Sequence, residues 1–386
     1  MKNRRIKLAV IGATGSVGSA VLDVCRAFPD SFEVVFLAAH SAVNKMINIA
    51  QDFHPEAVVL TNPHAASLFK GKGCSIPVFS GDEALYTMAT HPHVDHVVFA
   101  SSGTAAIKAL QGALKEGKEV SLANKESIVV GGPWVMPLVK RDSQLRPLDS
   151  EHNAIWQCLR GEMEREVSKI YLTASGGPFR TFTHKELESV TPSMAIAHPV
   201  WSMGHKLSID SATLMNKGIE LIEAMFLFRL QSKQVDAVIS PGSVVHGVVQ
   251  FIDGSMKMLA STPDMRLSAA SALGYPERLR AMSFVPELSL KELAINFYPP
   301  NEKLFPCLAL AKEAARRLGP YPALLIGADE GAIEAFVKNK ITFTQIPLVI
   351  EKAMALYNGG TPTSLDECIE ISQWAQHSVQ EITGGK

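Results

Sequence analysis

The stretch from His198 to Glu223 combines polar side chains whose types and spacing suit chemistry on a small molecule. Asn216, Lys217 and Glu220 are three or four positions apart, so a helix would place them on one side. Ser211, Asn216 and Lys217 could hold a phosphate group. Glu220 could hold a metal ion or a proton. The alternative is an ordinary amphipathic helix whose polar side faces solvent.

A second acidic group lies at Asp149-Ser150-Glu151. In an extended chain the carboxylates of Asp149 and Glu151 point the same way, and they repel each other unless a cation lies between them. With Glu220 they would form an all-oxygen site, which suits Mg²⁺ or Mn²⁺ better than Zn²⁺. The alternative is that Asp149 or Ser150 caps a helix starting near Asn153, and both interpretations can hold together.

A nucleotide-binding pattern opens the chain. The apolar run Ile6–Ile11 predicts a buried parallel strand, and the loop Gly12–Gly18 (GATGSVG) leads into a helical pattern. The glycines allow a pyrophosphate to approach the free N–H groups of the helix start. A second predicted strand, Phe32–Ala38, is not followed by the acidic residue that holds the ribose 2′-hydroxyl of NAD. Ser41 and Lys45 suit the additional phosphate of NADP instead.

Polar residues also follow later predicted strands. Apolar runs between Ala57 and Leu122 alternate with helical patterns, which predicts a parallel α/β sheet. Asn124, Lys125 and Glu126 come directly after the last of these strands, at the edge where open sheets bind ligands. A charged surface loop is the alternative.

A glycine pair ends a further apolar strand at Ser175-Gly176-Gly177. Successive glycines expose backbone N–H groups and can form an anion-binding nest. An ordinary turn at the end of a strand is the alternative.

Composition limits the class of protein. A chain of 386 residues predicts two or three domains, and 47% hydrophobic with 19% charged residues is typical of globular proteins. A net charge of −1 argues against partners such as nucleic acids or membrane surfaces. The five cysteines contain no CxxC pair. This spacing argues against a zinc site or a disulfide framework and fits a reducing cytoplasm. The short apolar run near the N-terminus predicts a strand rather than a signal peptide, and no apolar stretch approaches transmembrane length.

The second half of the chain predicts a small sheet and then helices. Two apolar runs, the second followed by the turn signal Asp253-Gly254, predict strands packed on one face, with a dimer surface plausible on the other. The Pro-rich segment Gly274–Pro300 predicts a linker. Asn358-Gly359-Gly360 predicts a helix C-cap, and Ser364 to Glu367 a capping box. The predicted strands are Val235–Ile239 and Val244–Ile252, and the predicted helices are Cys307–Leu318, Ala328–Asn339 and Leu348–Tyr357.

Six segments, GATGSVG, LANKES, LDSEHNAIWQ, ASGGPFR, HPVWSMGHKLSIDSATLMNKGIELIEA and DGSMKMLASTPDMR, occur between residues 12 and 266 in the order seen in one enzyme family. The chain resembles the 1-deoxy-D-xylulose 5-phosphate reductoisomerases, and the long central segment is the most specific part of the resemblance. The resemblance implies an α/β protein. Its expected parts are a Rossmann-like NADPH-binding domain (1–149), a middle α/β catalytic domain (150–274), a linker (275–300) and a small C-terminal helical domain (301–386).

The resemblance also assigns roles to residues of this chain. The expected metal ligands are Asp149, Glu151 and Glu220, and the expected catalytic residues are Lys125, Glu151 and His198. The expected substrate contacts are Lys125, Ser150, Glu151, Ser175, His198, Trp201, Ser211, Asn216, Lys217 and Glu220, with His198, Trp201 and Met203 in a lid. The expected NADPH contacts are Thr14, Gly15, Ser16, Val17, Asn124, Glu126 and Gly204, to which the strand argument adds Ser41.

The implied reaction rearranges 1-deoxy-D-xylulose 5-phosphate and reduces the product with NADPH to 2-C-methyl-D-erythritol 4-phosphate, an isoprenoid precursor. A divalent cation, Mg²⁺ or Mn²⁺, would act as Lewis acid. Lys125 would stabilise an enolate and Glu151 would handle a proton, while a lid carrying Trp201 excludes water. The resemblance further implies a homodimer whose partner is a sugar phosphate. The cysteines and the net charge predict a cytoplasmic protein with no nucleic-acid or membrane partner.

Some positions depart from the family pattern: Ala42, Val200, His205, and Ser240–Ser243 ahead of His246. Two other functions compete with this interpretation. A semialdehyde dehydrogenase would need a nucleophilic cysteine at the end of a strand, and none of the five cysteines has that context. A non-catalytic NADP-binding protein would not need the three carboxylates.

Overall fold

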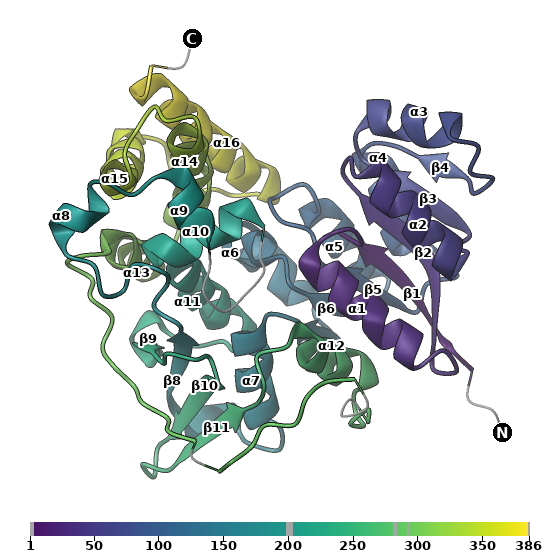
Figure 1. The fold of residues 1–386 in the computed structure, drawn as a ribbon, viewed down its shortest axis with the longest axis horizontal. Helices are drawn as coiled ribbons and strands as arrows, with labels where there is room; N and C mark the ends of the chain where they lie inside the picture. The colour runs from purple at the N-terminus through teal and green to yellow at the C-terminus, as the bar shows by residue number, and fades with distance from the viewer. Residues whose placement is uncertain (1–3, 198–203, 281–283, 292, 385–386) are drawn as a thin grey trace. The chain divides into compact units, whose positions relative to one another are not determined.

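The structure is a computed structural model, and it describes residues 4–197, 204–280, 284–291 and 293–384 (Figure 1). The chain forms two compact units. The first comprises Met1–Ser127, Val135–Trp156 and Asp264–Glu287, and the second comprises Ile128–Trp134, Gln157–Pro263 and Leu288–Lys386. The division expected from the sequence, with boundaries at 149, 274 and 300, stays a prediction.

The first unit contains a seven-stranded parallel sheet with the order β4-β3-β2-β1-β5-β6-β7. The predicted strands at Ile6–Ile11 and Glu119–Leu122 are confirmed, and so is the α/β fold class. Two short edge strands, β4 and β7, were not predicted, because two or three residues show no period. The strands are β1 (Ile6–Ile11), β2 (Phe32–Ala39), β3 (Ala57–Leu60), β4 (Val78–Phe79), β5 (His96–Phe99), β6 (Glu119–Leu122) and β7 (Leu145–Pro147).

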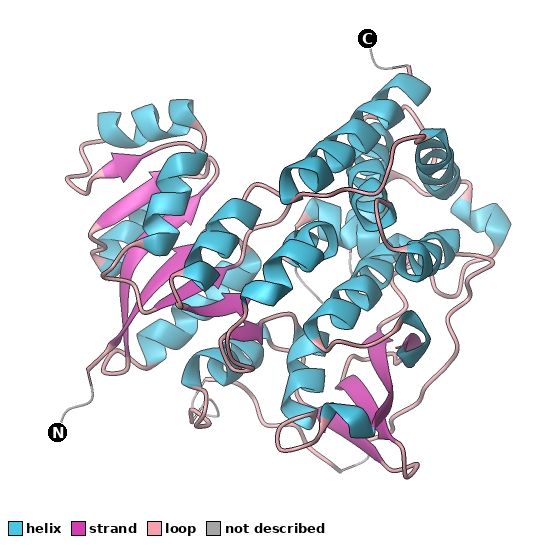
Figure 2. Cartoon of the chain, turned by 180° about the vertical axis from the view of Figure 1, so that it is seen from behind, coloured by secondary structure: helices cyan, strands magenta, loops and turns pink. Residues whose placement is uncertain are grey.

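Helices cover both faces of this sheet (Figures 1 and 2). Leu8 and Val10 of β1 belong to a core shared with the helices α1, α2 and α12. Ala9 and Ile11 are equally buried but lie outside that core, because successive side chains of a strand point to opposite faces. The helices of this unit are α1 (Ser16–Ala27), α2 (Val43–Phe53), α3 (Pro63–Gly71), α4 (Asp82–Thr90), α5 (Ile107–Lys115), α7 (Ser150–Cys158) and α12 (Met265–Gly274), with a 3-10 turn at Met136–Leu138. Helix α6 (Lys125–Val135) begins in this unit, but most of it, Ile128–Trp134, belongs to the second.

The second unit contains a four-stranded sheet with the order β11-β10-β8-β9. Strand β10 is antiparallel to β8 and β11, whereas β8 and β9 are parallel. The turn predicted at Asp253-Gly254 joins β10 to β11, and β11 was missed because its side chains are largely exposed and show no alternation. The strands are β8 (Val167–Ala174), β9 (Val235–Ile239), β10 (Val245–Phe251) and β11 (Met256–Ala260).

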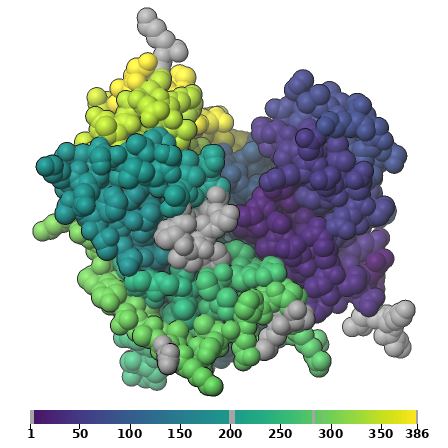
Figure 3. All heavy atoms as spheres, in the orientation of Figure 1, coloured from purple at the N-terminus to yellow at the C-terminus, as the bar shows by residue number. Residues whose placement is uncertain are grey.

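Helices form the remainder of the second unit, and the C-terminal ones gather into one body, yellow-green to yellow in Figure 3. Helix α14 packs closely on α16. The two backbones are so near that a Cβ added to Gly327 would lie 1.8 Å from the carbonyl oxygen of Ser372. The helices are α8 (His184–Leu187), α9 (Pro192–Ile196), α10 (His205–Thr213), α11 (Met215–Leu227), α13 (Pro306–Arg317), α14 (Tyr321–Val337), α15 (Ile346–Leu356) and α16 (Leu365–Ile382), with 3-10 turns at Glu164–Glu166, Ser232–Gln234 and Phe343–Gln345.

Local signals in this half were partly misleading. The expected C-cap after α15 is wrong, because Tyr357 ends the helix in an extended conformation. Ser364 does cap α16, accepting from the N–H of Glu367, but the carboxylate of Glu367 reaches back to Thr363. No helix in the described part of the chain has the length and apolar character needed to cross a membrane.

The central stretch is two helices rather than one loop and one helix. Helix α10 already begins at His205 and ends at Thr213, and Leu214 then adopts a left-handed conformation with φ of 62° before α11 starts. A left-handed residue interrupts the helical path, so α10 and α11 point in different directions. This break gives Ser211 and Asn216 different supporting helices.

Candidate active site

The glycine loop connects β1 to α1 at the point where the strand order reverses, since β1 lies between β2 and β5. Gly12 has a φ of +85°, and a Cβ there would lie 2.4 Å from the carbonyl carbon of Ala100, at the end of β5. Helix α1 begins at Ser16 after Gly15, with no acidic residue in its first turn and no side-chain cap. Gly15 and Ser16 are exposed, so the helix start can accept an anion from solvent.

The residues expected to distinguish NADP from NAD follow β2. Ser41 and Lys45 are exposed, at the carboxyl edge of the sheet and in the first turn of α2. Beside them, His40 Nδ1 lies 2.8 Å from the hydroxyl oxygen of Thr61, at the end of β3. No acidic residue occurs in the first turn of α2.

Asn124 connects the ends of two strands. Its amide nitrogen donates to the carbonyl oxygens of Ser101 and Gly103, each at 2.9 Å, and its amide oxygen accepts from the N–H of Ser127 at 2.9 Å. Asn124 therefore holds the loop after β5 against the start of α6, whatever else it contacts.

Lys125 and Asp149 form a largely buried ion pair, with Nζ 2.8 Å from Oδ2 and side chains 9% and 13% exposed. The other oxygen of Asp149 accepts from the N–H of Glu151 at 3.3 Å, at the start of α7. The capping alternative is thus confirmed for Asp149. Ser150 donates its hydroxyl to Oε2 of Glu151 at 2.5 Å.

Glu220 is buried in α11, together with Lys217. Its two carboxylate oxygens accept from the Asn216 amide at 2.5 Å and from the Lys217 ammonium group. The spacing of these residues predicted one side of a helix, and that is confirmed. The alternative of a solvated polar side is wrong, because only 3% of Lys217 and 1% of Glu220 is exposed.

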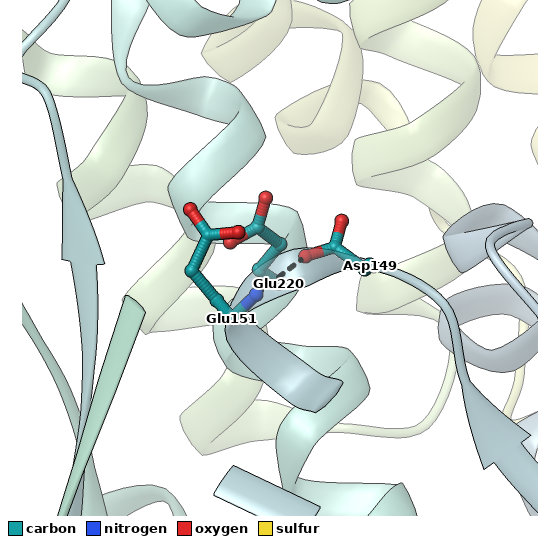
Figure 4. A group of neighbouring side chains, drawn as sticks. All are labelled: Asp149, Glu151 and Glu220. Atoms are coloured by element: carbon teal, nitrogen blue, oxygen red, sulfur yellow. Dashed lines mark hydrogen bonds between the residues drawn. The ribbon is translucent and has the colours of Figure 1, made fainter. Parts of the chain in front are cut away.

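The three carboxylates expected to bind metal are brought together (Figure 4). Asp149, Glu151 and Glu220 each offer an oxygen, and these oxygens lie within 4.8 Å of one another. Carboxylates at this spacing repel, and Lys125 and Lys217 offset only part of their charge. An all-oxygen set with three negative charges fits Mg²⁺ or Mn²⁺.

Two segments that carry residues expected to hold phosphate, the Ser175–Gly177 loop and α10, are in contact within the second unit. Gly176 and Gly177 both have a positive φ, and the N–H of Gly177 donates to the Ser175 hydroxyl at 3.3 Å. A Cβ on Gly177 would lie 2.7 Å from the carbonyl oxygen of Ser211. The loop after β8 is therefore pressed against α10, so that Ser175 and Ser211 are neighbours.

Other predicted residues stay predictions. His198, Trp201 and Met203 lie outside the described residues, as does Val200. Gly204 is exposed and is the N-cap of α10. The remaining predicted contacts have these positions: Thr14 and Val17 are half-buried beside the glycine loop, and Glu126 is buried at the start of α6.

His152 is a residue that the sequence analysis missed. It is fully buried, and its Nδ1 lies 3.5 Å from Oδ1 of Asp149. A signal was available, because a histidine three positions after Asp149 shares its side of a helix. His152 therefore adds a buried imidazole beside the carboxylate of Asp149.

Three family models match the chain. Residues 8–132 match 1-deoxy-D-xylulose 5-phosphate reductoisomerase, residues 145–228 its C-terminal domain, and residues 260–378 the DXP reductoisomerase C-terminal domain. A reductoisomerase of this name from Desulfosudis oleivorans is 43% identical over 374 residues, covering 96% of this chain and 97% of that one. One from Chloroherpeton thalassium is 42% identical over 97% of both. The chain belongs to the 1-deoxy-D-xylulose 5-phosphate reductoisomerase family.

Solved structures of the family agree with this fold. The Zymomonas mobilis enzyme in complex with NADPH has a TM-score of 0.88 and 35% identity, and the match covers 99% of this chain and 100% of that one. A DOX-P reductoisomerase in complex with NADPH, fosmidomycin and magnesium has a TM-score of 0.89 and 35% identity, with the same coverage. The Rossmann-like N-terminal part and the helical C-terminal part predicted for this family are confirmed.

The cysteines do not favour the competing semialdehyde dehydrogenase. Burial raises the pKa of the Cys25 thiol to about 12. Burial, together with the carboxylates of Asp329 and Asp210, raises the pKa of Cys307 well above its usual range. Both groups are therefore protonated near neutral pH, and a protonated thiol is a poor nucleophile.

Proposed function

We propose that this chain catalyses the NADPH-dependent isomerisation and reduction of 1-deoxy-D-xylulose 5-phosphate to 2-C-methyl-D-erythritol 4-phosphate, a step in isoprenoid precursor biosynthesis. The observation that carries this proposal is family membership over nearly the whole chain. The geometry within each unit supports it. The first unit offers an exposed helix start for a dinucleotide phosphate, and the second a hydroxyl-lined loop for a sugar phosphate.

The carboxylates of Asp149, Glu151 and Glu220 would hold the divalent cation. When bound, Mg²⁺ or Mn²⁺ supplies Lewis-acid polarisation of the substrate's carbonyl group. Lys125, which is paired with Asp149, would offset the negative charge of an enolate. Glu151, whose carboxylate accepts from Ser150, is the candidate for moving the substrate's proton.

Two further groups of residues would bind the substrate and cofactor. Ser175, Ser211, Asn216 and Lys217 would hold the phosphate, and this remote binding energy would orient the reacting carbons. His198 and Trp201 would belong to a lid that excludes water from the enolate. The NADPH contacts we propose are Thr14, Gly15, Ser16, Val17, Ser41, Asn124, Glu126 and Gly204.

A single assay tests the function. Purified protein is mixed with 1-deoxy-D-xylulose 5-phosphate and NADPH, with and without Mn²⁺, while the nicotinamide absorbance is followed. We expect NADPH oxidation that requires both the sugar phosphate and the cation, because hydride transfer must await the rearrangement. The proposal would be wrong if NADPH oxidation did not depend on the cation, or if no NADPH oxidation occurred.

We further infer a cytoplasmic homodimer. All five cysteines are free thiols, which supports a reducing compartment. The edge strand β11 supports an interface between copies of the chain, because it exposes Met256, Met258 and the neighbouring Ile252. An exposed apolar strand edge needs a covering partner, and an identical edge is self-complementary.

The oligomeric state can be measured by light scattering during size-exclusion chromatography. We expect twice the 41.8 kDa mass of one chain. The double variant Met256→Lys, Met258→Lys should shift the mass to one chain, because charges on the strand edge oppose pairing. Leu348→Lys, which is equally exposed but lies on α15, should remain a dimer. A dimeric double variant would place the interface elsewhere.

A further inference from the structure

A buried ionic network links α10 to the C-terminal helices. Lys206 Nζ lies 2.7 Å from Oδ2 of Asp210 and 3.1 Å from Oδ2 of Asp329. The side chains of Asp210 and Asp329 are only 3% and 1% exposed. Asp329 lies on α14 between the buried residues Ala328 and Gly331, and its own burial shields the carboxylate from solvent.

Among the described residues, the network joins two carboxylates to one ammonium group. Burial, followed by the charge of Asp210, raises the pKa of Asp329 well above its usual range, while Lys206 opposes the shift. Cys307 of α13 also faces this network. Two buried carboxylates beside a single ammonium group carry an excess of negative charge, which is unfavourable in the interior.

Helix α14 is a rigid support for this network. Gly327 lets its backbone approach Ser372 of α16, and a Cβ on Gly331 would lie 2.8 Å from the Val379 side chain of the same helix. Contacts this close leave α14 little freedom to shift. Asp329 therefore presents its carboxyl group from a fixed position.

The other end of the network lies at the proposed phosphate pocket. Asp210 directly precedes Ser211, whose carbonyl oxygen is the atom pressed against Gly177. A rotation or shift of α10 would therefore change the distance between the hydroxyl groups of Ser211 and Ser175. None of the three charged residues is among the expected substrate or cofactor contacts.

We propose that Asp329, acting through Lys206 and Asp210, is a positioning residue that fixes Ser211 opposite the Ser175–Gly177 loop and so sets the affinity for the substrate's phosphate group. This inference rests on the proposed function, and specifically on the proposed phosphate pocket. The C-terminal helices then take part in substrate binding without contacting the substrate.

The test compares two substitutions at one position. Asp329→Ala removes the partner of Lys206 on α14 and leaves its pairing with Asp210 on α10. We expect the KM for 1-deoxy-D-xylulose 5-phosphate to rise on the order of tenfold while the KM for NADPH stays within about twofold. Asp329→Asn retains an oxygen that accepts from Lys206 and resembles the protonated acid. We expect it to restore the sugar-phosphate KM to within about threefold of the unsubstituted chain.

Two further variants serve as a second test and as a control. Lys206→Gln removes the bridging charge from a partly exposed side chain, so it keeps the proposal testable if Asp329→Ala does not fold; the same rise in KM is expected. Asp236→Asn is the matched control, because Asp236 pairs with Lys169 and Lys312 in the same unit but lies on β9. It should leave both KM values unchanged.

Several results would overturn the inference. An unchanged sugar-phosphate KM in both Asp329→Ala and Lys206→Gln would remove the network from phosphate binding. Parallel losses for the sugar phosphate and NADPH, or an Asp329→Asn variant as impaired as the alanine variant, would reduce it to a role in folding. Failure of the proposed function is distinguishable, because the unsubstituted chain would then show no turnover.

Discussion

Replacing Glu220 with Gln should remove nearly all metal-dependent turnover and leave NADPH binding intact, because the three carboxylates are proposed to hold the cation. Glutamine preserves the shape of this buried side chain, but it removes one of three negative charges from the group. The interaction between a divalent cation and a carboxylate depends on that charge. We expect kcat to fall by a factor on the order of 10³, measured by NADPH oxidation at saturating Mg²⁺.

Glu223→Gln provides the control for this result. Glu223 is also buried and lies on α11, three residues further along, but it is not one of the three converging carboxylates. Its substitution should change kcat by no more than about threefold, because the cation site is unaltered. An active Glu220→Gln variant would remove Glu220 from the metal site. Equal losses in both variants would mean that the helix, not the cation, had been disturbed.

Replacing Gly12 with Ala should weaken NADPH binding by on the order of 100-fold. The new Cβ would lie 2.4–2.5 Å from backbone atoms of Ala100 and Ser101, so the loops after β1 and β5 must separate. Those loops flank the exposed start of α1, where the dinucleotide phosphate is expected. Displacing them would move backbone N–H groups away from the position of that phosphate. The dissociation constant for NADPH can be measured by calorimetry.

Gly73→Ala separates steric conflict from backbone strain. Gly73 has a φ of +75°, close to the +85° of Gly12, but a Cβ there would meet nothing within 4 Å. Both substitutions carry the same left-handed strain of about 1–2 kcal/mol, which lowers the free energy of unfolding. Only Gly12→Ala should also lose NADPH affinity. Unchanged affinity in that variant would place the cofactor away from the glycine loop.

Local patterns in the sequence were sufficient for the central strands. The run Ile6–Ile11 and the run Glu119–Leu122 are apolar throughout because parallel strands are covered on both faces, and their bounds match those observed. Strand β11 escaped notice because an exposed edge strand has no buried face to impose alternation. The start of α10 at His205 also escaped, because polar groups rather than an apolar stripe hold that helix.

Taken alone, the sequence determined the chemical types available to this protein: oxygen ligands for a hard cation, a glycine loop for a dinucleotide, and hydroxyl, amide and ammonium groups for a phosphate. Those follow from residue identity and near-neighbour spacing. Only the tertiary structure decided which groups meet and how deeply they are buried. Lys125 pairs with Asp149 across 24 residues and Lys206 with Asp329 across 123, and the burial of Lys217 beside Glu220 depends on helices packed around them. Contacts between residues distant in the chain arise from long-range packing, which no local period encodes.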